Sequence, residues 1–181
     1  DLLSSGVVSE TGTLKGNLGR RSIGIRLNAE NFNVVGIKIA RRSYSVGIFN
    51  IKNQLLDKTY QKLEPSTGAS AVLQSLVADA RRLIDKYGSC CAIGVAVPGP
   101  YLRREGRIAV MTEFVGWEKI DIYKKLSDAF EQPVFVEHDA NAGALGEWNC
   151  SANIGSDDVL VHLLASEGIG SGVVIDGKII S

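Results

Sequence analysis

The chain of 181 residues has few cysteines, only four prolines and no long apolar segment. No stretch of about 18 apolar residues occurs, which argues against a membrane span. No charged-then-apolar leader opens the chain, so secretion is not expected. The three cysteines, adjacent Cys90 and Cys91 and distant Cys150, match neither a disulfide framework nor a zinc motif. We therefore expect reduced, buried thiols in a soluble cytoplasmic protein with no membrane partner.

The net charge is zero, because 20 Lys and Arg balance 20 Asp and Glu, yet the cations are unevenly distributed. Residues 11–42 hold seven Lys or Arg against one Glu. Such a local excess suits an anionic partner, either a nucleic acid or a phosphorylated ligand. A solvated face that binds nothing is the alternative, and charge alone does not exclude it.

The first 28 residues have the pattern of a helix end followed by a β-hairpin. Residues 1–5 with Gly6 resemble the last turn of a helix and its glycine stop. A short strand is predicted at 7–10, a polar, glycine-rich basic loop at 11–19 and an alternating strand at 22–27. This order is typical of the wing of a winged helix-turn-helix. Because so short a helix cannot fold alone, we expect further residues before Asp1.

A second unit begins at residue 33. Residues 34–40, 44–50 and 54–62 are predicted to form a three-stranded meander. Apolar residues at helical spacing predict a helix over 69–87, capped by Ser66 or Thr67 and ended by Gly88.

The next segments alternate apolar runs with a second helix. Residues 91–97 are almost all apolar, which predicts a strand buried on both faces, ended by Pro98-Gly99-Pro100. A helix at 118–130 and a second buried strand at 133–137 follow. Three antiparallel strands, then helix, parallel strand, helix and parallel strand, is the order of the ribonuclease-H-like unit of the actin and sugar-kinase folds. The predicted fold class is therefore α/β and actin-like.

The remaining residues repeat the opening of such a unit. They predict a helix at 141–150, strands at 158–164 and 172–175, and a hairpin turn at Asp176-Gly177 into residues 178–180. We expect three parts, at residues 1–28 (remnant of a winged helix-turn-helix), 29–137 (first lobe) and 138–181 (start of a second lobe). On this interpretation the chain is truncated at both ends.

Four short segments carry the most specific signal. They are VAVPGP at 95–100, FVGW at 114–117, EHDANAGALGE at 137–147 and EGIGSG at 167–172. In this order and spacing they resemble the ROK family of bacterial sugar kinases and sugar-responsive repressors. The N-terminal segment resembles the repressor branch of that family, the NagC, Mlc and XylR type. The resemblance implies a homodimeric or larger repressor of carbohydrate-metabolism genes, whose binding to operator DNA responds to a sugar or sugar-phosphate effector.

The resemblance also implies a sugar site. Asp139 matches the catalytic aspartate of the kinases, which takes a proton from a sugar hydroxyl, although it could also cap the following helix. His138 stands where the kinases have a sugar-contacting Asn, and Gly99 where the backbone approaches the sugar. Glu113 replaces another frequent Asn and can only accept hydrogen bonds. Trp117 is expected to serve packing.

The phosphate loops differ from those of the kinases. The family's Asp-x-Gly-Gly-Thr organises Mg²⁺ and admits ATP phosphates, but the matching stretch here is Lys38-Ile39-Ala40-Arg41-Arg42. The second loop keeps Gly168-Ile169-Gly170, yet Glu167 before it would repel ATP phosphates at close range. We therefore expect no catalytic residue and no kinase activity. Lys38, Arg41 and Arg42 either bind the phosphate of an effector or are surface cations on a hairpin tip.

In the wing, Lys15, Asn17, Arg20 and Arg21 are predicted to contact DNA phosphates or an A/T-rich minor groove. No cofactor or metal is expected in this chain, and the family's structural zinc site would lie beyond Ser181. Two other functions stay open. One is an active ATP-dependent sugar kinase, which the altered phosphate loop and the wing disfavour; the other is a sugar-binding protein that neither phosphorylates nor represses.

Overall fold

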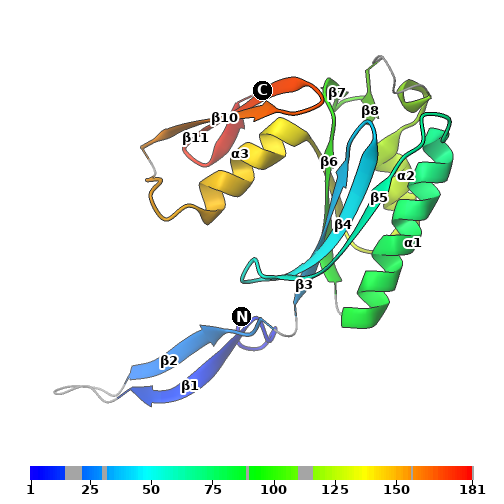
Figure 1. Cartoon of the computed structure of the whole chain (residues 1–181). Coiled ribbons are helices and arrows are strands. Elements are labelled where there is room, and N and C mark those ends of the chain that lie inside the picture. The colour runs from blue at the N-terminus through cyan, green and yellow to red at the C-terminus, as the bar shows by residue number, and fades with distance from the viewer. Residues whose placement is uncertain (15–21, 30–31, 89, 110–115, 156, 181) are drawn as a thin grey trace.

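The mixed sheet at the centre of the molecule follows the predicted strand order. The computed structural model describes residues 1–14, 22–29, 32–88, 90–109, 116–155 and 157–180, and there this sheet has the order β5-β4-β3-β6-β9 (Figure 1). The strands are β3 (Asn33–Ile39), β4 (Ser43–Asn50), β5 (Leu55–Lys62), β6 (Cys90–Val97) and β9 (Val134–His138). The first three pair antiparallel, whereas β6 and β9 run parallel to β3. The predicted ribonuclease-H-like order is confirmed.

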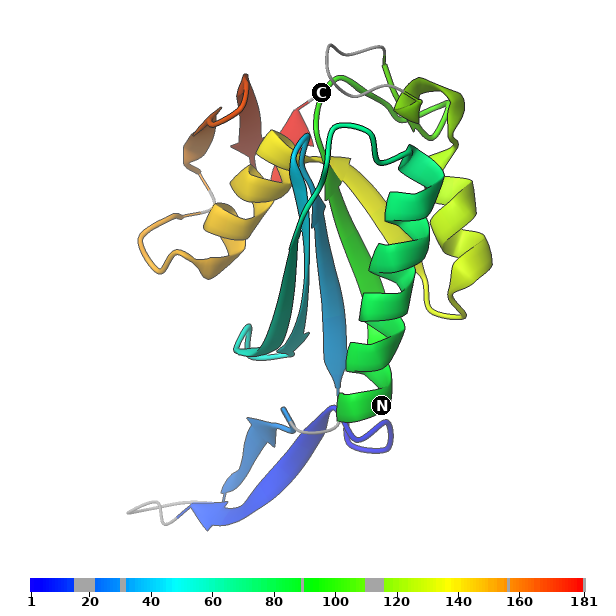
Figure 2. The same cartoon turned by 45° about the vertical axis from the view of Figure 1, so that its right-hand side comes forward.

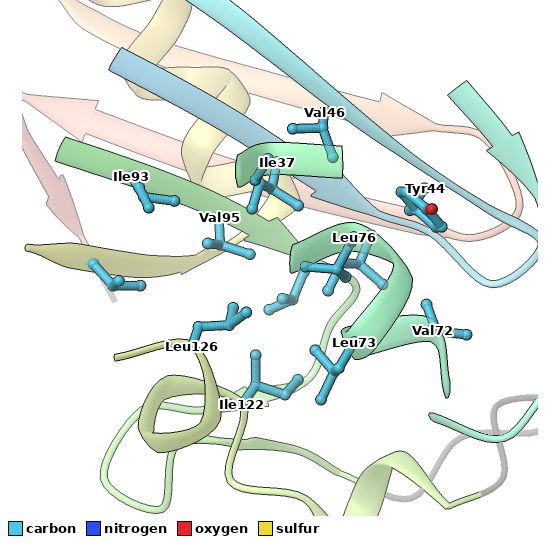
Figure 3. Packing of buried hydrophobic residues seen from close by; sticks show 14 of the residues in the cluster. Ile37, Tyr44, Val46, Val72, Leu73, Leu76, Ile93, Val95, Ile122 and Leu126 are labelled. Atoms are coloured by element: carbon cyan, nitrogen blue, oxygen red, sulfur yellow. The ribbon is translucent and has the colours of Figure 1, made fainter. Parts of the chain in front are cut away.

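Two helices, α1 (Ala69–Tyr87) and α2 (Ile122–Ala129), cover one face of this sheet (Figure 2). The apolar positions of both helices meet the alternating inward side chains of the strands, and Figure 3 shows this core. Among its fully or almost fully buried members are Ile37, Val46, Leu76, Ile93, Val95, Ile122 and Leu126. Each such side chain contributes roughly 1.5–3 kcal/mol through burial, so this face holds the lobe together. No helix of the described residues is long and apolar enough to cross a membrane.

The ends of α1 agree only in part with the sequence pattern. The helix spans the predicted residues and ends at Gly88, whose positive φ of 70° is a backbone angle that glycine adopts without strain. Its N-cap, however, is Gly68, which offers no side-chain hydrogen bond. The predicted cap by Ser66 or Thr67 is therefore wrong, because the residue directly before the first helical residue, Ala69, is Gly68.

The helix predicted at 118–130 is divided in two. A short 3-10 turn, η1 (Trp117–Lys119), precedes α2, and Asp121 caps α2 by accepting a hydrogen bond from the backbone N–H of Lys124 at 2.8 Å. Trp117 is 3% exposed, which confirms its expected packing role. Two short paired strands, β7 (Tyr101–Leu102) and β8 (Arg107–Ile108), lie between β6 and this turn.

The opposite face of the sheet is covered by neither α1 nor α2. Phe135 in β9 is 64% exposed, and Cys91 and Gly94 in β6 are exposed as well. The prediction that both parallel strands are buried on both faces is therefore wrong. The expectation of buried thiols fails for Cys91 and Cys150, which are free and exposed, while burial raises the pKa of the half-buried Cys90 thiol.

Beyond β9 the chain enters a second, smaller layer pair. Helix α3 (Asp139–Cys150) packs on an antiparallel sheet of β10 (Val159–Ala165), β11 (Ile169–Ile175) and β12 (Lys178–Ile180) (Figure 1). A Cβ atom on Gly172 of β11 would collide with the carbonyl of Ala140, so glycine is what allows α3 to lie this close. The helix begins two residues earlier than predicted.

The N-terminal residues form a hairpin that extends away from the central sheet (Figure 1). Strand β1 (Val8–Leu14) pairs antiparallel with β2 (Ser22–Leu27). Before them lies a single turn, in which the backbone N–H of Ser5 donates to the carbonyl of Asp1 at 3.0 Å and Gly6 follows with φ of 76°. The loop that carries Lys15, Asn17, Arg20 and Arg21 lies outside the described residues.

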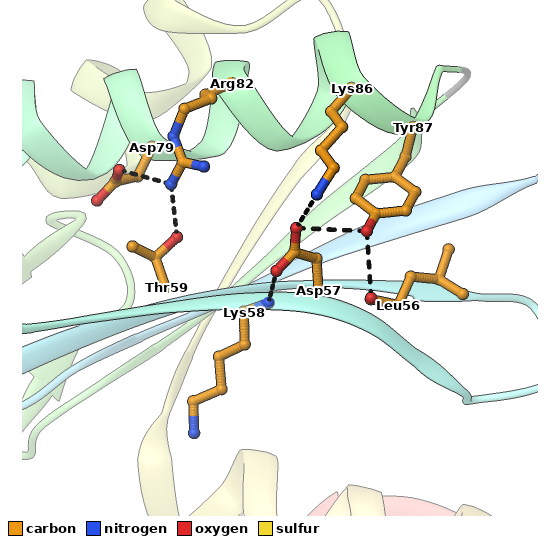
Figure 4. Close-up of polar contacts among 8 residues, drawn as sticks. All are labelled: Leu56, Asp57, Lys58, Thr59, Asp79, Arg82, Lys86 and Tyr87. Atoms are coloured by element: carbon orange, nitrogen blue, oxygen red, sulfur yellow. Dashed lines mark hydrogen bonds and ion pairs between the residues drawn. The ribbon is translucent and has the colours of Figure 1, made fainter.

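Polar side chains connect the edge strand β5 to α1 (Figure 4). The Lys86 ammonium donates to Asp57 Oδ2 at 2.7 Å, and the Tyr87 hydroxyl donates to the same oxygen at 3.3 Å. One turn earlier, Arg82 donates to the Thr59 hydroxyl at 3.0 Å. Because β5 is an edge strand that pairs only with β4, these contacts with α1 help to hold it in the sheet.

Candidate functional site

A cleft of about 690 Å³ opens at the carboxyl ends of β6 and β9, the edge at which open α/β sheets bind ligands. Four segments line it: the end of β3 with the β3–β4 turn, the stretch from Pro98 to Arg104 after β6, the end of β9 with the start of α3, and the residues around the β10–β11 turn. The cleft therefore lies between the central sheet and the second layer pair, and residues from both form its walls.

Two predicted sugar residues, His138 and Asp139, lie where β9 passes into α3. The Asp139 side chain, 15% exposed, accepts a hydrogen bond from the backbone N–H of Ala140 at 2.8 Å. It is the first residue of α3 and not its N-cap, so the capping role considered from the sequence is wrong; His138 occupies the cap position without a side-chain bond.

The imidazole of His138 is packed from three sides. Its Nε2 lies 3.2 Å from Asp139 Oδ1. A Cβ atom on Gly99 would come within 2.7 Å of its Cδ2, and a Cβ atom on Gly170 within 3.5 Å of its Cε1. A Cβ atom at residue 99 would thus meet only His138 atoms among its nearest neighbours, and the approach of a sugar to the Gly99 backbone stays a prediction. The peptide bond between Gly99 and Pro100 is cis.

Glu137, which sequence reasoning missed, organises the strand end before these residues. Its Oε1 accepts hydrogen bonds from the His138 backbone N–H at 2.9 Å and from Asn141 Nδ2 at 3.1 Å. Its Oε2 forms an ion pair with Arg103 from the turn after β7. All four residues line the cleft. The only sequence signal was a carboxylate two positions before Asp139, which does not identify the partners.

Tyr101, at the start of β7, also lines the cleft. Burial raises the pKa of its hydroxyl, and the nearby carboxylates of Asp121 and Glu137 add to this effect. The phenol therefore stays neutral and can donate a hydrogen bond towards a ligand at neutral pH.

The β3–β4 turn brings cations to the opposite rim. Lys38 and Arg41 both line the cleft, whereas Arg42 does not, so the structure joins two of the three predicted phosphate-binding residues. The backbone N–H of Arg41 donates to Glu167 Oε2 at 3.1 Å. This bond connects the β3–β4 turn to the β10–β11 turn across the mouth of the cleft.

One further predicted sugar residue, Glu113, lies outside the described residues, as do the four predicted DNA-contacting residues of the wing. The described part of the cleft combines an imidazole and a neutral phenol with three carboxylates (Glu137, Asp139 and Glu167) and four cations (Lys38, Arg41, Arg103 and Arg104). Such a set can bind a polyhydroxylated ligand, whose hydroxyls both donate and accept, with an anionic group at the cationic rim.

The family model described as the ROK family matches residues 34–181. Among curated relatives, the xylose repressor of Caldicellulosiruptor bescii is 25% identical over 184 residues, covering 99% of this chain and 45% of the repressor. The glucokinase of Thermotoga maritima is 26% identical over 148 residues, covering 82% of this chain and 46% of the enzyme. The chain thus spans about half the length of the curated relatives it matches.

Solved structures divide in the same way. A ROK family transcriptional regulator described as a homologue of the E. coli MLC protein has a TM-score of 0.76 and 20% identity, covering 99% of this chain and 46% of its own. A ROK hexokinase from Thermus thermophilus has a TM-score of 0.70 and 33% identity, covering 82% of this chain and 48% of its own. The regulators match essentially the whole chain, and the kinases match about four fifths of it.

Proposed function

Because the chain belongs to the ROK family, we propose that it acts as a carbohydrate-responsive transcriptional repressor and not as a sugar kinase. The observation that carries this proposal is the extent of the matches. The xylose repressor aligns with 99% of the chain, and the glucokinase with 82%. The family model begins at residue 34, after the N-terminal β-hairpin, and the basic loop of that hairpin suits contact with DNA phosphates.

The composition of the β3–β4 turn supports the same proposal. A kinase needs a carboxylate for Mg²⁺ and open backbone for ATP phosphates on this turn. Here Lys38 and Arg41 line the cleft and the turn bonds to a glutamate. A cation in place of a metal ligand, and a carboxylate beside the phosphate path, both oppose phosphoryl transfer from ATP.

We propose that the effector is a sugar, neutral or phosphorylated, that enters the cleft beside Gly99, Glu113, His138 and Asp139. Asp139 would accept a hydrogen bond from a hydroxyl, and His138 would supply a ring nitrogen to its neighbour. Because one wall belongs to the central sheet and the other to the second layer pair, a ligand that contacts both shifts their relative position if it binds one arrangement more tightly. In a dimer, this shift would alter the spacing of the DNA-binding parts.

The test is a gel-shift titration of the full-length protein on DNA from its own promoter, followed by neutral sugars and then sugar phosphates. We expect retardation that one sugar class releases and that weakens steeply with salt. The double variant Arg20→Ala/Arg21→Ala should lower the affinity for DNA roughly tenfold and reduce the salt slope by about two, one for each phosphate contact. Lys119→Ala, an exposed lysine on η1, is the control and should change neither.

Two outcomes would overturn the proposal. One is a lack of DNA retardation at low salt. The other is ATP-dependent phosphorylation of a sugar, followed by ADP release, that is lost in Asp139→Asn; this would establish the kinase instead.

A further inference from the structure

The bond between the Arg41 backbone N–H and Glu167 Oε2 joins residues 126 positions apart in sequence. Arg41 lies in the turn between β3 and β4, and Glu167 lies in the turn between β10 and β11. Both residues line the cleft. A backbone N–H of this kind can bind an anion. Here the anion that it binds is the carboxylate of Glu167, which the protein itself supplies from the other side of the cleft.

Two further cations accompany this N–H. The side chains of Lys38 and Arg41 line the same rim, and neither forms a hydrogen bond or ion pair with another described residue. The Arg41 guanidinium lies over the second turn, since its Nη2 is 3.5 Å from the position of a Cβ atom on Gly168. The rim therefore carries two cations and the single carboxylate of Glu167.

The nearest other acids of the cleft are engaged elsewhere. Glu137 is paired with Arg103, and Asp139 is bonded to the Ala140 N–H at the start of α3. Glu167 uses its Oε2 to accept the Arg41 backbone N–H, and its single charge leaves the two cations incompletely neutralised. A group with more oxygens and more charge would satisfy the N–H and both cations together.

We propose that the β3–β4 turn is a phosphate-binding site that Glu167 fills from across the cleft, so that a phosphorylated ligand and the cross-cleft contact exclude each other. This inference rests on the proposed effector cleft and specifies its ligand class as a phosphate monoester. A phosphate provides three oxygens for the Arg41 N–H, the Arg41 guanidinium and the Lys38 ammonium. It cannot share the rim with Glu167, because the two anions repel each other at contact distance.

The consequence is a defined difference between neutral and phosphorylated sugars. A phosphorylated sugar has to displace Glu167 and thereby breaks the contact between the two turns. A neutral sugar bound near His138 and Asp139 leaves that contact intact. The same carboxylate thus lowers the affinity for phosphate and couples its binding to separation of the cleft walls.

The test measures phosphate binding directly by calorimetry on the full-length protein, with inorganic phosphate, glucose 6-phosphate and glucose as separate ligands. Glu167→Gln removes the charge and keeps an oxygen that can accept the Arg41 N–H bond. We expect this variant to bind inorganic phosphate and glucose 6-phosphate at least fivefold more tightly than the wild type, with glucose binding unchanged. Glu131→Gln, an exposed glutamate outside the cleft lining, is the matched control and should change none of the three.

A second pair of variants examines the cations. In the Glu167→Gln background, Lys38→Gln and Arg41→Gln should each reduce phosphate affinity at least fivefold, and Lys125→Gln, on the exposed side of α2, should not. Selective ¹⁵N-arginine labelling adds a readout of the contact itself. Phosphate should move the Arg41 backbone amide resonance in the wild type, and Glu167→Gln should move it without any ligand.

The inference is wrong if Glu167→Gln leaves phosphate affinity within twofold of the wild type, or if it alters glucose and glucose 6-phosphate equally. This test is independent of the test of the repressor proposal, because it measures the binding of phosphate and sugars without DNA. If the protein did not bind promoter DNA but Glu167→Gln bound phosphate more tightly, the repressor proposal would be wrong and the phosphate-site proposal would be supported. DNA binding without any effect of Glu167 would do the reverse.

Discussion

The imidazole of His138 occupies the space beside Gly99 that any larger side chain would need. A Cβ atom at residue 99 would lie 2.7 Å from Cδ2 of His138, while Asp139 Oδ1 lies 3.2 Å from its Nε2. Both contacts are made inside the cleft. The orientation of His138 is thus determined by the absence of a side chain at residue 99.

Gly99→Ala is therefore expected to displace the imidazole without unfolding the protein. In the full-length protein, the effector concentration that half-releases promoter DNA should rise roughly tenfold, as for the loss of one hydrogen bond of about 1.4 kcal/mol. The histidine ring resonances of His138 should shift in the same variant. Unchanged release and unchanged resonances would show that the cleft does not depend on this contact.

Gly146→Ala is the matched control for that experiment and makes a prediction of its own. Gly146 lies in α3, and a Cβ atom there meets no other atom within 4 Å. Alanine restricts the unfolded chain and favours the helix, so the free energy of unfolding should increase by about 0.5–1 kcal/mol. Effector release should stay unchanged. Destabilisation in chemical denaturation would contradict the described environment of this residue.

The contact between Asp57 and Lys86 should make stability depend on pH at both extremes. The hydrogen bond from Lys86 lowers the pKa of Asp57 below its ordinary 3.8, and the same bond raises the pKa of Lys86 above 10.5. The Asp57 contribution is therefore present above pH 3.8 and is lost as pH falls through the lowered value. The Lys86 contribution is present below pH 10.5 and is lost as pH rises through the raised value.

Asp57→Asn should accordingly lower the Tm by a few degrees at most at neutral pH, because the pair is exposed to solvent. The difference from the wild type should vanish in strong acid, which thermal unfolding across pH would record. Asp128→Asn, which removes the exposed pair with Lys124 on α2, offers a comparison outside the β5–α1 contact. A constant difference at every pH would mean that the loss reflects packing and not charge.

The buried Tyr44 hydroxyl donates to Asp79 Oδ2 at 2.9 Å. Burial, followed by this hydrogen bond, raises the pKa of Tyr44 to about 12. Its contribution to stability is present below pH 10, the ordinary value, and is lost as pH rises from 10 towards 12. Tyr44→Phe should reduce the free energy of unfolding by about 1–2 kcal/mol at neutral pH.

The same variant should also remove the step near pH 12 from the absorbance titration of the tyrosines. Tyr123→Phe, which replaces a tyrosine that is 50% exposed, is the control and should leave stability almost unchanged. If Tyr44→Phe were as stable as the wild type, the hydrogen bond to Asp79 would contribute nothing net.

Local sequence patterns predicted the elements in which apolar and polar residues alternate with a regular period. The helix over residues 69–87 and the strand over residues 22–27 were predicted with their observed bounds, because helical and strand periodicities depend on near neighbours. The strand order of the first lobe followed from the sequence of element types, since crossover connections have one hand. Lys38, Arg41, His138 and Asp139 were also recognised as cleft residues from the motifs around them.

What the tertiary structure decided depends on pairs far apart in the chain. Whether helices cover one face of β6 or both depends on where those helices pack, and the apolar sequence of residues 91–97 does not contain that information. The N-cap of α1 is Gly68 and not Ser66 or Thr67, and the neighbour that leaves no room for a side chain at residue 99 is His138. The contact between Arg41 and Glu167 arises only when two turns meet across the cleft. The sequence by itself determined the elements and the chemical groups, since both are local properties; their partners were decided by folding, because partnership requires proximity that no local pattern encodes.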